Sequence, residues 1–426
     1  MNGQRHFFFS SVLFVLGAIV LIILFAFKAN MSQSFYVYPL LFLYSYFIVI
    51  FELSRVAGAM FYERVSSRIL PTNPAYEPYV SFVIPCKNEE AAIANTIEKC
   101  FAADYPKSKL EVIVVNDGST DRTGEVLHAL KRKYRQLVVI DWKVNRGKRH
   151  GMAAGFKIAK GDIVVQLDSD SYIDPRTFRQ LIIPFSNPSI GAVCAHADPA
   201  NADQNMLTKM QAAYYFMSFR VLKAAESAFF TVFCCSGCSS AYRKSVVLPI
   251  IDIWLNEKFL GKPVTWGDDR ALTNWVLRLG HQTIYTDRAR AFTIVPTTMK
   301  QLLKQQVRWK KGWFVNSLSI AGFILKTRPF VALTYFFPLI FITLVTPFIV
   351  TRIMFYNPIV SGSLPLLYFF GILLIAAIIT LYYRHVSREN KYWPYVFVWA
   401  LLNSVVLSFI LFYALFRLND RKWGTR

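Results

Sequence analysis

Two aspartates one residue apart, Asp168 and Asp170, follow a short Val/Ile-rich run. Carboxylates with this spacing at the end of a strand can hold a hard divalent cation, and that cation can bridge the oxygens of a diphosphate. A turn is the alternative interpretation, because Asp is favoured in turns and Asp174-Pro175 follows closely. The pair therefore predicts either a metal and diphosphate site or a turn cluster.

A second acidic pair, Asp268 and Asp269, stands immediately before a helical pattern from Ala271 to Leu279. Acidic residues at a helix start complement the helix dipole, which is a purely structural role. The catalytic alternative is that one carboxylate caps the helix while the other points into a cleft. There it would act as general base towards a reacting hydroxyl.

Three residues of complementary chemistry share one face of a predicted helix. Gln305, Arg308 and Trp309 occur at positions i, i+3 and i+4. They supply an amide, a planar cation suited to diphosphate oxygens, and an indole on which a sugar ring can stack. An amphipathic helix lying on the membrane surface is the other interpretation. The two are compatible, since a site here would lie at the mouth of a membrane channel.

Three further residues are candidates for nucleotide binding. Asp117 lies in a Gly-Ser turn between a strand and a helix, where an N-cap role is the alternative. Lys148 and Arg149 follow Gly147 and suit phosphate contacts, or else form an ordinary solvated helix start. No G-x-G-x-x-G follows the early strands and no G-x-x-x-x-G-K-[ST] occurs, which argues against a dinucleotide oxidoreductase and a P-loop nucleotidase.

The elements that must position these residues lie between about residues 80 and 296. Short Val/Ile-rich runs alternate there with segments of helical spacing, which predicts a mostly parallel sheet covered by helices. Ligands of such sheets bind beyond the carboxyl ends of the strands, where the acidic residues fall. The predicted strands are Val80–Ile84, Leu110–Val115 and Asp162–Leu167, and the predicted helices are Glu89–Ala103, Thr123–Tyr134 and Arg149–Ala159.

Cys235 and Cys238 form a C-x-x-C pair, the spacing of half a zinc site or of a redox motif. No second pair with matching spacing occurs, so buried reduced thiols or a tight turn around Gly237 are the favoured interpretation.

Apolar residues gather at the two ends of the chain. Of the 426 residues, 54% are hydrophobic and 17% charged, against about a quarter charged in soluble domains. This composition argues against a wholly soluble protein and excludes a disordered one. Phe7–Phe27 and Phe35–Phe51 predict a helical hairpin rather than a cleaved signal peptide, because a second apolar run follows the first. Arginines flank the hairpin on the side of the middle region, which places that region in the cytoplasm.

Three more apolar runs lie near the other end: Phe330–Val350, Ile359–Tyr383 and Tyr395–Phe416. Cationic clusters flank the last run on both sides, and one straight span cannot join two cytoplasmic clusters. Either one run is interfacial or re-entrant, with Pro329, Pro338, Pro347 and Pro394 as candidate breaks, or one cluster is outside. We expect an even number of crossings. The net charge of +22 suits membrane lipids and phosphorylated ligands; its place beside membrane segments argues against nucleic acid.

In this order the motifs resemble the D, D-x-D, acidic, Q-x-x-R-W series of processive inverting membrane glycosyltransferases, which include cellulose, chitin and hyaluronan synthases. The similarity to bacterial hyaluronan synthases is the greatest and covers nearly the whole chain. It extends to Gly147–His150, Gly267–Asn274 and Trp423–Arg426. Ser236-Gly237-Cys238 departs from the family's Ser-Gly-Pro turn, and Lys310–Trp313 departs from its usual continuation.

The resemblance implies a GT-A-like cytoplasmic α/β glycosyltransferase domain combined with an α-helical multi-pass domain in the cell membrane. The domains it implies are a hairpin at 1–55, a linker at 56–79, a catalytic domain at 80–298, interfacial helices at 299–328 and a membrane region at 329–426.

The resemblance also implies a role for each candidate. Asp117 would contact the uridine of a UDP-sugar donor, with Lys148 and Arg149 helping to hold it, and Asp168 and Asp170 would position Mg²⁺ or Mn²⁺. Arg308 would stabilise departing UDP, Asp269 beside Asp268 would be the base, and Trp309 with Gln305 would bind the growing polysaccharide. The alternative products are hyaluronan, made from UDP-GlcNAc and UDP-GlcA, and a chitin-type homopolymer made from UDP-GlcNAc.

Overall fold

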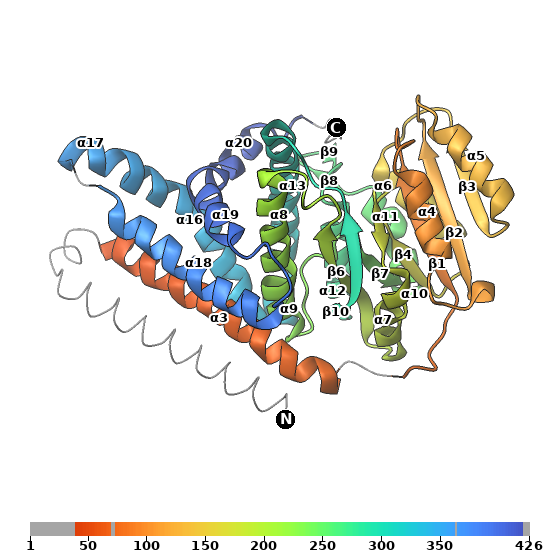
Figure 1. The fold of residues 1–426 in the computed structure, drawn as a ribbon, viewed down its shortest axis with the longest axis horizontal. Helices are drawn as coiled ribbons and strands as arrows, with labels where there is room; N and C mark the ends of the chain where they lie inside the picture. The colour runs from red at the N-terminus through yellow and green to blue at the C-terminus, as the bar shows by residue number, and fades with distance from the viewer. Residues whose placement is uncertain (1–38, 70–72, 363, 421–426) are drawn as a thin grey trace.

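The structure is a computed structural model that describes residues 39–69, 73–362 and 364–420. The predicted span Phe7–Phe27 and the terminal Trp423–Arg426 segment lie outside the described residues. Figure 1 shows a sheet flanked by helices on one side of the molecule and a group of long helices on the other.

An eight-stranded mixed sheet forms the core of the first region, in the order β3-β2-β1-β4-β7-β6-β10-β5. β3, β2, β1 and β4 are parallel, as are β6 and β10, whereas β7 and β5 run antiparallel to their neighbours. All strands of this sheet except β7 and β5 therefore run in one direction, so the predicted mostly parallel sheet is confirmed. The strands are β1 Val80–Cys86, β2 Leu110–Asp117, β3 Leu137–Trp142, β4 Ile163–Gln166, β5 Ser171–Ile173, β6 Ile190–Pro199, β7 Ser240–Arg243 and β10 Gln282–Thr293; β8 Lys258–Phe259 and β9 Lys262–Pro263 form a separate ribbon.

The strands at the centre form where near-continuous Val and Ile residues can be buried on both faces. Every residue of β1 and β2 is buried, as expected for parallel strands covered by helices on each side. In α4, the buried residues Ile93, Ile97 and Cys100 recur at helical spacing and pack into the main core. The helices of this region are α4 Ile93–Phe101, α5 Thr123–Lys133, α6 Lys148–Ile158, α7 Arg179–Ile182, α8 Met206–Phe216, α9 Ala224–Ser227, α10 Lys244–Val247, α11 Ile251–Leu255 and α12 Asp268–Arg278.

The helical region contains α3 Pro39–Ile69, α13 Met299–Ala321, α14 Ile324–Thr327, α15 Pro329–Val331, α16 Phe337–Thr351, α17 Asn357–Ser361, α18 Leu366–Val386, α19 Tyr395–Val405 and α20 Ile410–Phe416. Within the described residues, two helices are long and apolar enough to cross a membrane, 329–361 and 368–386. α19 and α20 together would make a third, bent by 43° at the break between them. α3 continues beyond residue 55, where the sequence suggested a linker, as far as Ile69.

The four prolines that were candidate breaks fall into two pairs. Pro329 begins α15 and Pro394 is the N-cap residue of α19, so these two mark helix starts. Pro338 and Pro347 lie inside a continuous helical segment. Two turns of π-helix, Ala332–Phe336 and Arg352–Tyr356, precede Pro338 and Pro358, and such adjustments accommodate the missing proline N–H. The bend in the last apolar run falls at Val406, where no proline stands.

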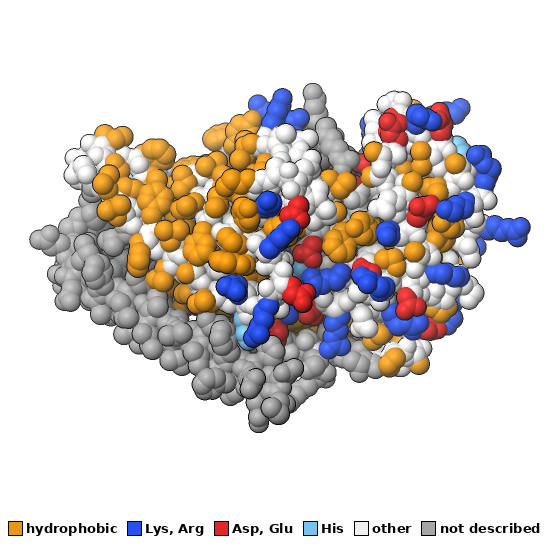
Figure 2. Space-filling model, viewed as in Figure 1, with side chains coloured by type: hydrophobic (Ala, Val, Ile, Leu, Met, Phe, Trp, Pro, Cys, Tyr) orange, Lys and Arg blue, Asp and Glu red, His pale blue; other side chains and the backbone are white. Residues whose placement is uncertain are grey.

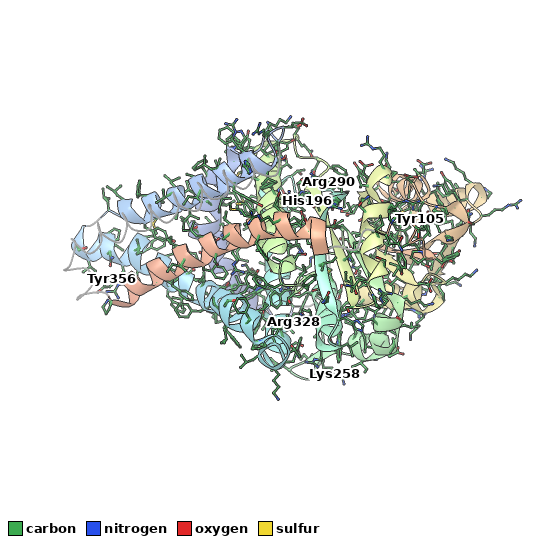
Figure 3. The ribbon with its side chains drawn as sticks, turned by 90° about the horizontal axis from the view of Figure 1, so that it is seen from below. Tyr105, His196, Lys258, Arg290, Arg328 and Tyr356 are labelled. Atoms are coloured by element: carbon green, nitrogen blue, oxygen red, sulfur yellow. The ribbon has the colours of Figure 1, made fainter. Side chains whose placement is uncertain are left out.

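The two regions differ in surface and are joined by polar contacts. In Figure 2, hydrophobic side chains gather over the long helices, while cations and acids cover the sheet region. Figure 3 places Tyr356 at the far end of the helices and Tyr105 at the opposite end of the molecule. Arg328 lies between them and donates to the His281 carbonyl at 3.0 Å. Arg220 pairs with Glu63 of α3 at 2.6 Å, which ties this long helix to the sheet region.

Candidate active site

A cavity of about 430 Å³ lies where the segment after β4, the starts of α6 and α12, and α13 meet. It brings together residues that are up to 165 positions apart in the sequence, from 148 to 313. The predicted site residues that line it are Lys148, Asp168, Asp170, Asp268, Asp269, Gln305, Arg308 and Trp309. Asp117 and Arg149 do not line this cavity, and the contacts that they make are described below.

The D-x-D segment is positioned by the chain reversal after β4. Asp168 donates its backbone N–H to the Gly237 carbonyl at 3.1 Å, and its carboxylate accepts from the Lys148 ammonium. Burial lowers the pKa of Lys148, but the carboxylates of Asp168 and Asp268 outweigh it and raise that pKa above its ordinary value. Lys148 therefore stays charged beside the aspartates.

The D-x-D carboxylates fit a cation that arrives with a diphosphate. Among the residues that the structure describes, no three His, Cys, Asp or Glu side chains are grouped to hold a metal ion. Mg²⁺ commonly binds through one or two carboxylates and completes its shell with water and substrate phosphates. Asp168 and Asp170 both line the cavity and supply that number of protein ligands.

Asp117, at the end of β2, holds the loop that leads into α6. It is 3% exposed, and its two carboxylate oxygens accept the backbone N–H groups of Arg146 at 2.6 Å and Gly147 at 2.8 Å. Gly147 has φ +96°, a conformation that favours glycine. Asp117 thereby fixes the start of α6 and with it Lys148. Its predicted contact with uridine stays a prediction.

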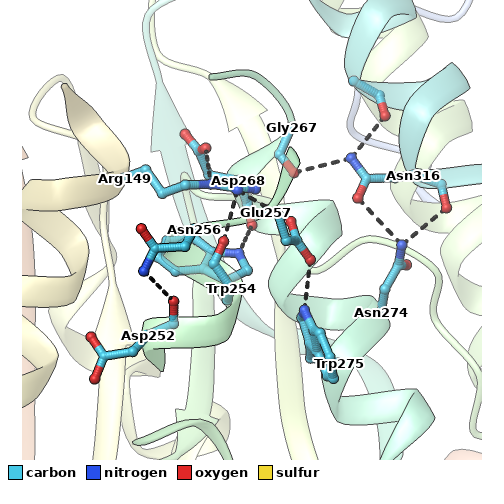
Figure 4. A network of polar contacts seen from close by, with 11 residues as sticks. Arg149, Asp252, Trp254, Asn256, Glu257, Gly267, Asp268, Asn274, Trp275 and Asn316 are labelled. Carbon is cyan, nitrogen blue, oxygen red and sulfur yellow. Dashed lines mark hydrogen bonds and ion pairs between the residues drawn. The ribbon is translucent and has the colours of Figure 1, made fainter. Parts of the chain in front are cut away.

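Arg149 is not among the residues that line the cavity, but it contacts Asp268, which does (Figure 4). Its guanidinium donates to the Asp268 carboxylate at 3.1 Å, to Glu257 at 3.1 Å and to the Trp254 carbonyl at 2.9 Å. Arg149 is 5% exposed and stacks on the Trp254 ring, 4.6 Å from its centroid. These contacts make Arg149 a residue that positions Asp268, and its predicted contact with the donor stays a prediction.

The two acids at the start of α12 have different partners. Asp268 is buried against Arg149, whereas Asp269 accepts the backbone N–H of Gly237 at 3.2 Å. Cys234 lies 3.6 Å from the same Asp269 oxygen. Gly237 thus contacts Asp168 through its carbonyl and Asp269 through its N–H, and so links the two acidic motifs.

Two glycines allow α12 to approach α13 closely. Gly267 caps α12 with φ +71°, and a Cβ added at Gly312 would lie only 2.9 Å from the Gly267 Cα. Asn316 of α13 donates to the Gly267 carbonyl at 3.4 Å, and the Asn274 side chain donates to the Asn316 carbonyl at 3.1 Å (Figure 4). This contact places the acids of α12 against the Gln305–Trp309 segment.

α13 begins with a reciprocal capping box between Thr298 and Gln301. Gln305, Arg308 and Trp309 line the cavity from this helix. The Trp309 ring lies 6.5 Å from that of Tyr214, which stacks at 4.5 Å on Trp399 of α19. An aromatic series therefore runs from the cavity to the C-terminal helices.

Several cavity residues were not singled out from the sequence. Lys223 belongs to a π-helical turn, Met217–Lys223, and donates to Ser236 at 2.9 Å, so it supports the turn that contains Gly237. π-helical turns are frequent at functional sites, but a π-turn has no sequence pattern of its own. The turn suggested around Gly237 does reach the site: a Cβ there would lie 3.1 Å from an Asp168 oxygen. The other lining residues not predicted include Tyr214, Arg270, Gln306, Lys310 and Trp313.

A mostly parallel sheet, with a D-x-D segment, a helix-start aspartate and a Q-x-x-R-W helix around one cavity, defines a glycosyltransferase of the GT-A-like class. The model of glycosyl transferase family 2 matches residues 81–248. A mannosyltransferase of Pyrobaculum calidifontis, solved with GDP-Man and Mn²⁺, shares the fold with a TM-score of 0.60 and 19% identity, covering 89% of this chain and 100% of that one.

Two curated relatives carry the comparison further. Hyaluronan synthase from Streptococcus pyogenes serotype M1 is 34% identical over 370 residues, which cover 82% of this chain and 86% of the relative. An N-acetylglucosaminyltransferase from Azorhizobium caulinodans is 26% identical over 89% of this chain and 93% of that protein. The chain therefore belongs to glycosyl transferase family 2, and it is a glycosyltransferase related to the hyaluronan synthases.

Proposed function

We propose that this chain is a processive, inverting membrane glycosyltransferase that polymerises UDP-GlcNAc and UDP-GlcA into hyaluronan. One observation carries the proposal. The D-x-D pair, Asp269 and the Gln305–Trp309 segment meet in one cavity, in a chain that is 34% identical to a hyaluronan synthase over 82% of its length. The similarity extends well beyond the matched family domain, which ends at residue 248.

In the proposed reaction, an acceptor hydroxyl attacks the anomeric carbon of the donor sugar. Its proton passes to the Asp269 carboxylate as the new glycosidic bond forms. The bond from the anomeric carbon to the diphosphate breaks at the same time, and its electron pair leaves with UDP. A single displacement of this kind inverts the anomeric centre and needs no covalent sugar intermediate.

The cavity residues give the remaining roles. Asp168 and Asp170 would hold Mg²⁺ or Mn²⁺, which when bound neutralises charge on the diphosphate. Arg308 would stabilise the departing UDP through its planar guanidinium. Trp309 and Gln305 would bind the acceptor sugar. Asp117 and Lys148 would position the donor, and Arg149 would act through Asp268.

The proposal includes export of the chain through the protein's own membrane helices. Support comes from the aromatic series of Trp309, Tyr214 and Trp399, which leads from the cavity to α19. The cavity would lie on the cytoplasmic side, where nucleotide sugars are made, and the apolar helices 329–361 and 368–386 would cross the cell membrane. Because the site lies beside these helices, the growing polysaccharide can move outwards along them as it binds.

A chitin-oligosaccharide or other UDP-GlcNAc homopolymer synthase is the second candidate. The relative from Azorhizobium caulinodans, which covers 89% of this chain, favours it. The two candidates share every catalytic group and differ in whether a glucuronate donor is used.

The test is UDP release by detergent-purified full-length protein with Mg²⁺ or Mn²⁺ and UDP-GlcNAc, UDP-GlcA or both. The hyaluronan proposal predicts polymer only when both donors are present, and its digestion by hyaluronidase. Sustained release with UDP-GlcNAc alone, giving a product that chitinase degrades, would support the second candidate instead. No release with any sugar nucleotide would contradict both.

A further inference from the structure

α13 presents a second set of side chains to the cavity beside the Gln305–Trp309 set. Gln306, Lys310 and Trp313 follow one another at i, i+4 and i+7, so they share a face, and all three line the cavity. Successive residues of a helix are about 100° apart around its axis, so this face adjoins the one that carries Gln305, Arg308 and Trp309. α13 therefore lines the cavity over two neighbouring faces.

Gln306 brings an unsatisfied hydrogen-bond donor to this face. The residue is 6% exposed, and within the described part of the chain its amide nitrogen has no hydrogen-bond partner. Buried polar groups in native proteins are almost always paired, so an unpaired one that lines a cavity indicates a missing acceptor. An oxygen atom of a ligand in the cavity would supply that acceptor.

Two cations complete the set. Arg270, at the start of α12, lines the same cavity as Lys310. Burial and the positive charge of Arg270 lower the pKa of Lys310 to about 8. In the described residues, neither side chain forms an ion pair with a carboxylate, whereas Lys148 is paired with Asp168. Two like charges that form no ion pair with a carboxylate favour binding of an anionic ligand.

The chemistry of the set fits a sugar carboxylate. In the proposed reaction the D-x-D pair and Arg308 interact with the diphosphate, and Arg308 lies on the neighbouring face of α13. The Lys310 ammonium lies 5.9 Å from the centroid of the Trp313 ring, so a cation stands beside an indole on which a sugar ring can stack. A hexuronate combines a ring with a carboxylate, whereas an N-acetylhexosamine is neutral.

We propose that Gln306, Lys310 and Arg270 form a subsite that binds the carboxylate of hexuronate units, with Trp313 against the sugar ring. This inference rests on the proposed function and names the groups that would select glucuronate. The carboxylate belongs either to the UDP-GlcA donor or to a glucuronate unit of the growing chain, and the chemistry of binding is the same in both cases.

The test compares ligand binding by purified full-length protein with Lys310 unchanged, Lys310→Gln or Lys310→Arg. Lys304→Gln is the matched control, since Lys304 is an exposed lysine on the same helix. The donor probes are UDP, UDP-GlcNAc and UDP-GlcA, and the chain probes are a hyaluronan tetrasaccharide and a chitin tetrasaccharide. Titration calorimetry at pH 7 gives each dissociation constant.

We expect Lys310→Gln to weaken the binding of a carboxylate-bearing probe about ten-fold or more, because charge-assisted hydrogen bonds are stronger than neutral ones. The matching neutral probe and UDP should change less than two-fold, and Lys310→Arg should restore binding. Weaker binding of UDP-GlcA would assign the subsite to the donor. Weaker binding of the hyaluronan tetrasaccharide would assign it to the growing chain.

Two results would overturn this inference but not the proposed function. One is equally weakened binding of UDP and UDP-GlcA, which would indicate a diphosphate contact. The other is an unchanged dissociation constant for every probe. If the unaltered protein bound neither carboxylate-bearing probe and released UDP only from UDP-GlcNAc, the hyaluronan proposal would fail and the inference with it. Measurements on the unaltered protein therefore distinguish failure of the hyaluronan proposal from failure of this inference alone.

A pH series gives an independent readout. Lys310 loses its charge as the pH rises through about 8, whereas arginine does not. Affinity for the carboxylate-bearing probe should therefore fall between pH 8 and pH 9 in the unaltered protein and stay level in Lys310→Arg. The other charged groups that line the cavity are Lys148, Asp168, Asp170, Lys223, Asp268, Asp269, Arg270 and Arg308. An equal fall in Lys310→Arg would assign the pH effect to one of these groups and contradict the role of Lys310.

Discussion

Asp268 and Asp269 are adjacent in sequence, yet their partners give them different roles. Asp268 is enclosed with Arg149, Glu257 and Trp254, so its carboxylate is already committed to an ion pair. Asp269 accepts the N–H of Gly237 in the cavity wall, where an acceptor hydroxyl can reach it. The sequence allowed one of the two to be structural and the other catalytic, and the contacts support the proposal that Asp268 is structural and Asp269 is the base.

Removal of Arg149 should therefore act first on stability. Arg149→Met leaves the buried Asp268 carboxylate unpaired, and breaking such a pair costs about 3–5 kcal/mol. We expect a clear fall in the midpoint of thermal unfolding in detergent, with loss of transfer activity. Lys157→Met is the control, because it breaks an exposed pair with Asp252 on the same helix, α6, and should leave the midpoint nearly unchanged. Equal midpoints for the two variants would contradict the positioning role of Arg149.

At the scale of elements, the contact between α12 and α13 sets the position of Asp269 relative to Arg308. In the proposed reaction these two residues must act on the same substrate. Gly312→Ala adds a Cβ that would lie 2.9 Å from backbone of Gly267, so the two helices must separate. A displacement of about 1 Å can cost about a hundred-fold in rate. We expect transfer to fall by about ten- to a hundred-fold, measured as UDP release.

The matched control for that change is Gly322→Ala at the end of the same helix. A Cβ there would approach only the Ser319 carbonyl, at 3.5 Å, which is ordinary contact. Activity of Gly322→Ala should equal that of the unaltered protein. Full activity in Gly312→Ala would show that the close approach of the glycines is not needed.

How far the elements can be predicted depends on whether the signal is local. The runs starting at Val80 and Leu110 are apolar throughout and form β1 and β2. The antiparallel insertion of β7 between β4 and β6 depends on pairing between segments far apart in the chain, and no local pattern encodes it. Pro347 was a candidate break because proline lacks an N–H, but it lies within α16.

For the site, the residue types indicated the chemistry, whereas the partners of each residue came only from the fold. Arg149 illustrates the limit: its place beside Lys148 suggested phosphate binding, but consecutive helical residues point in different directions, and Arg149 points into the protein. Gln306 and Lys310 were missed for the same reason, since only the fold reveals that two faces of α13 line the cavity.

For the whole molecule, the proposed function requires the catalytic cavity and the far ends of the long helices to lie on opposite sides of the membrane. Val360, near the turn that ends α17, and Leu260, in the β8–β9 ribbon, are both exposed apolar residues. A membrane-impermeant maleimide should label Val360→Cys in intact cells and Leu260→Cys only after permeabilisation. The unaltered chain, in which five of the six cysteines are buried and Cys234 is partly buried, gives the background. The reverse labelling pattern would contradict the proposed orientation.

The most direct test of the central claim, that this cavity is a sugar-transfer site with Asp269 as its base, is Asp269→Asn measured in two ways. The amide keeps an acceptor for the Gly237 N–H but cannot take a proton, so transfer should fall by about 10²–10⁴-fold while UDP binds as before. Asp252→Asn, an exposed change on α11, serves as control. Polymer synthesis by Asp269→Asn at the rate of the unaltered protein would contradict the account.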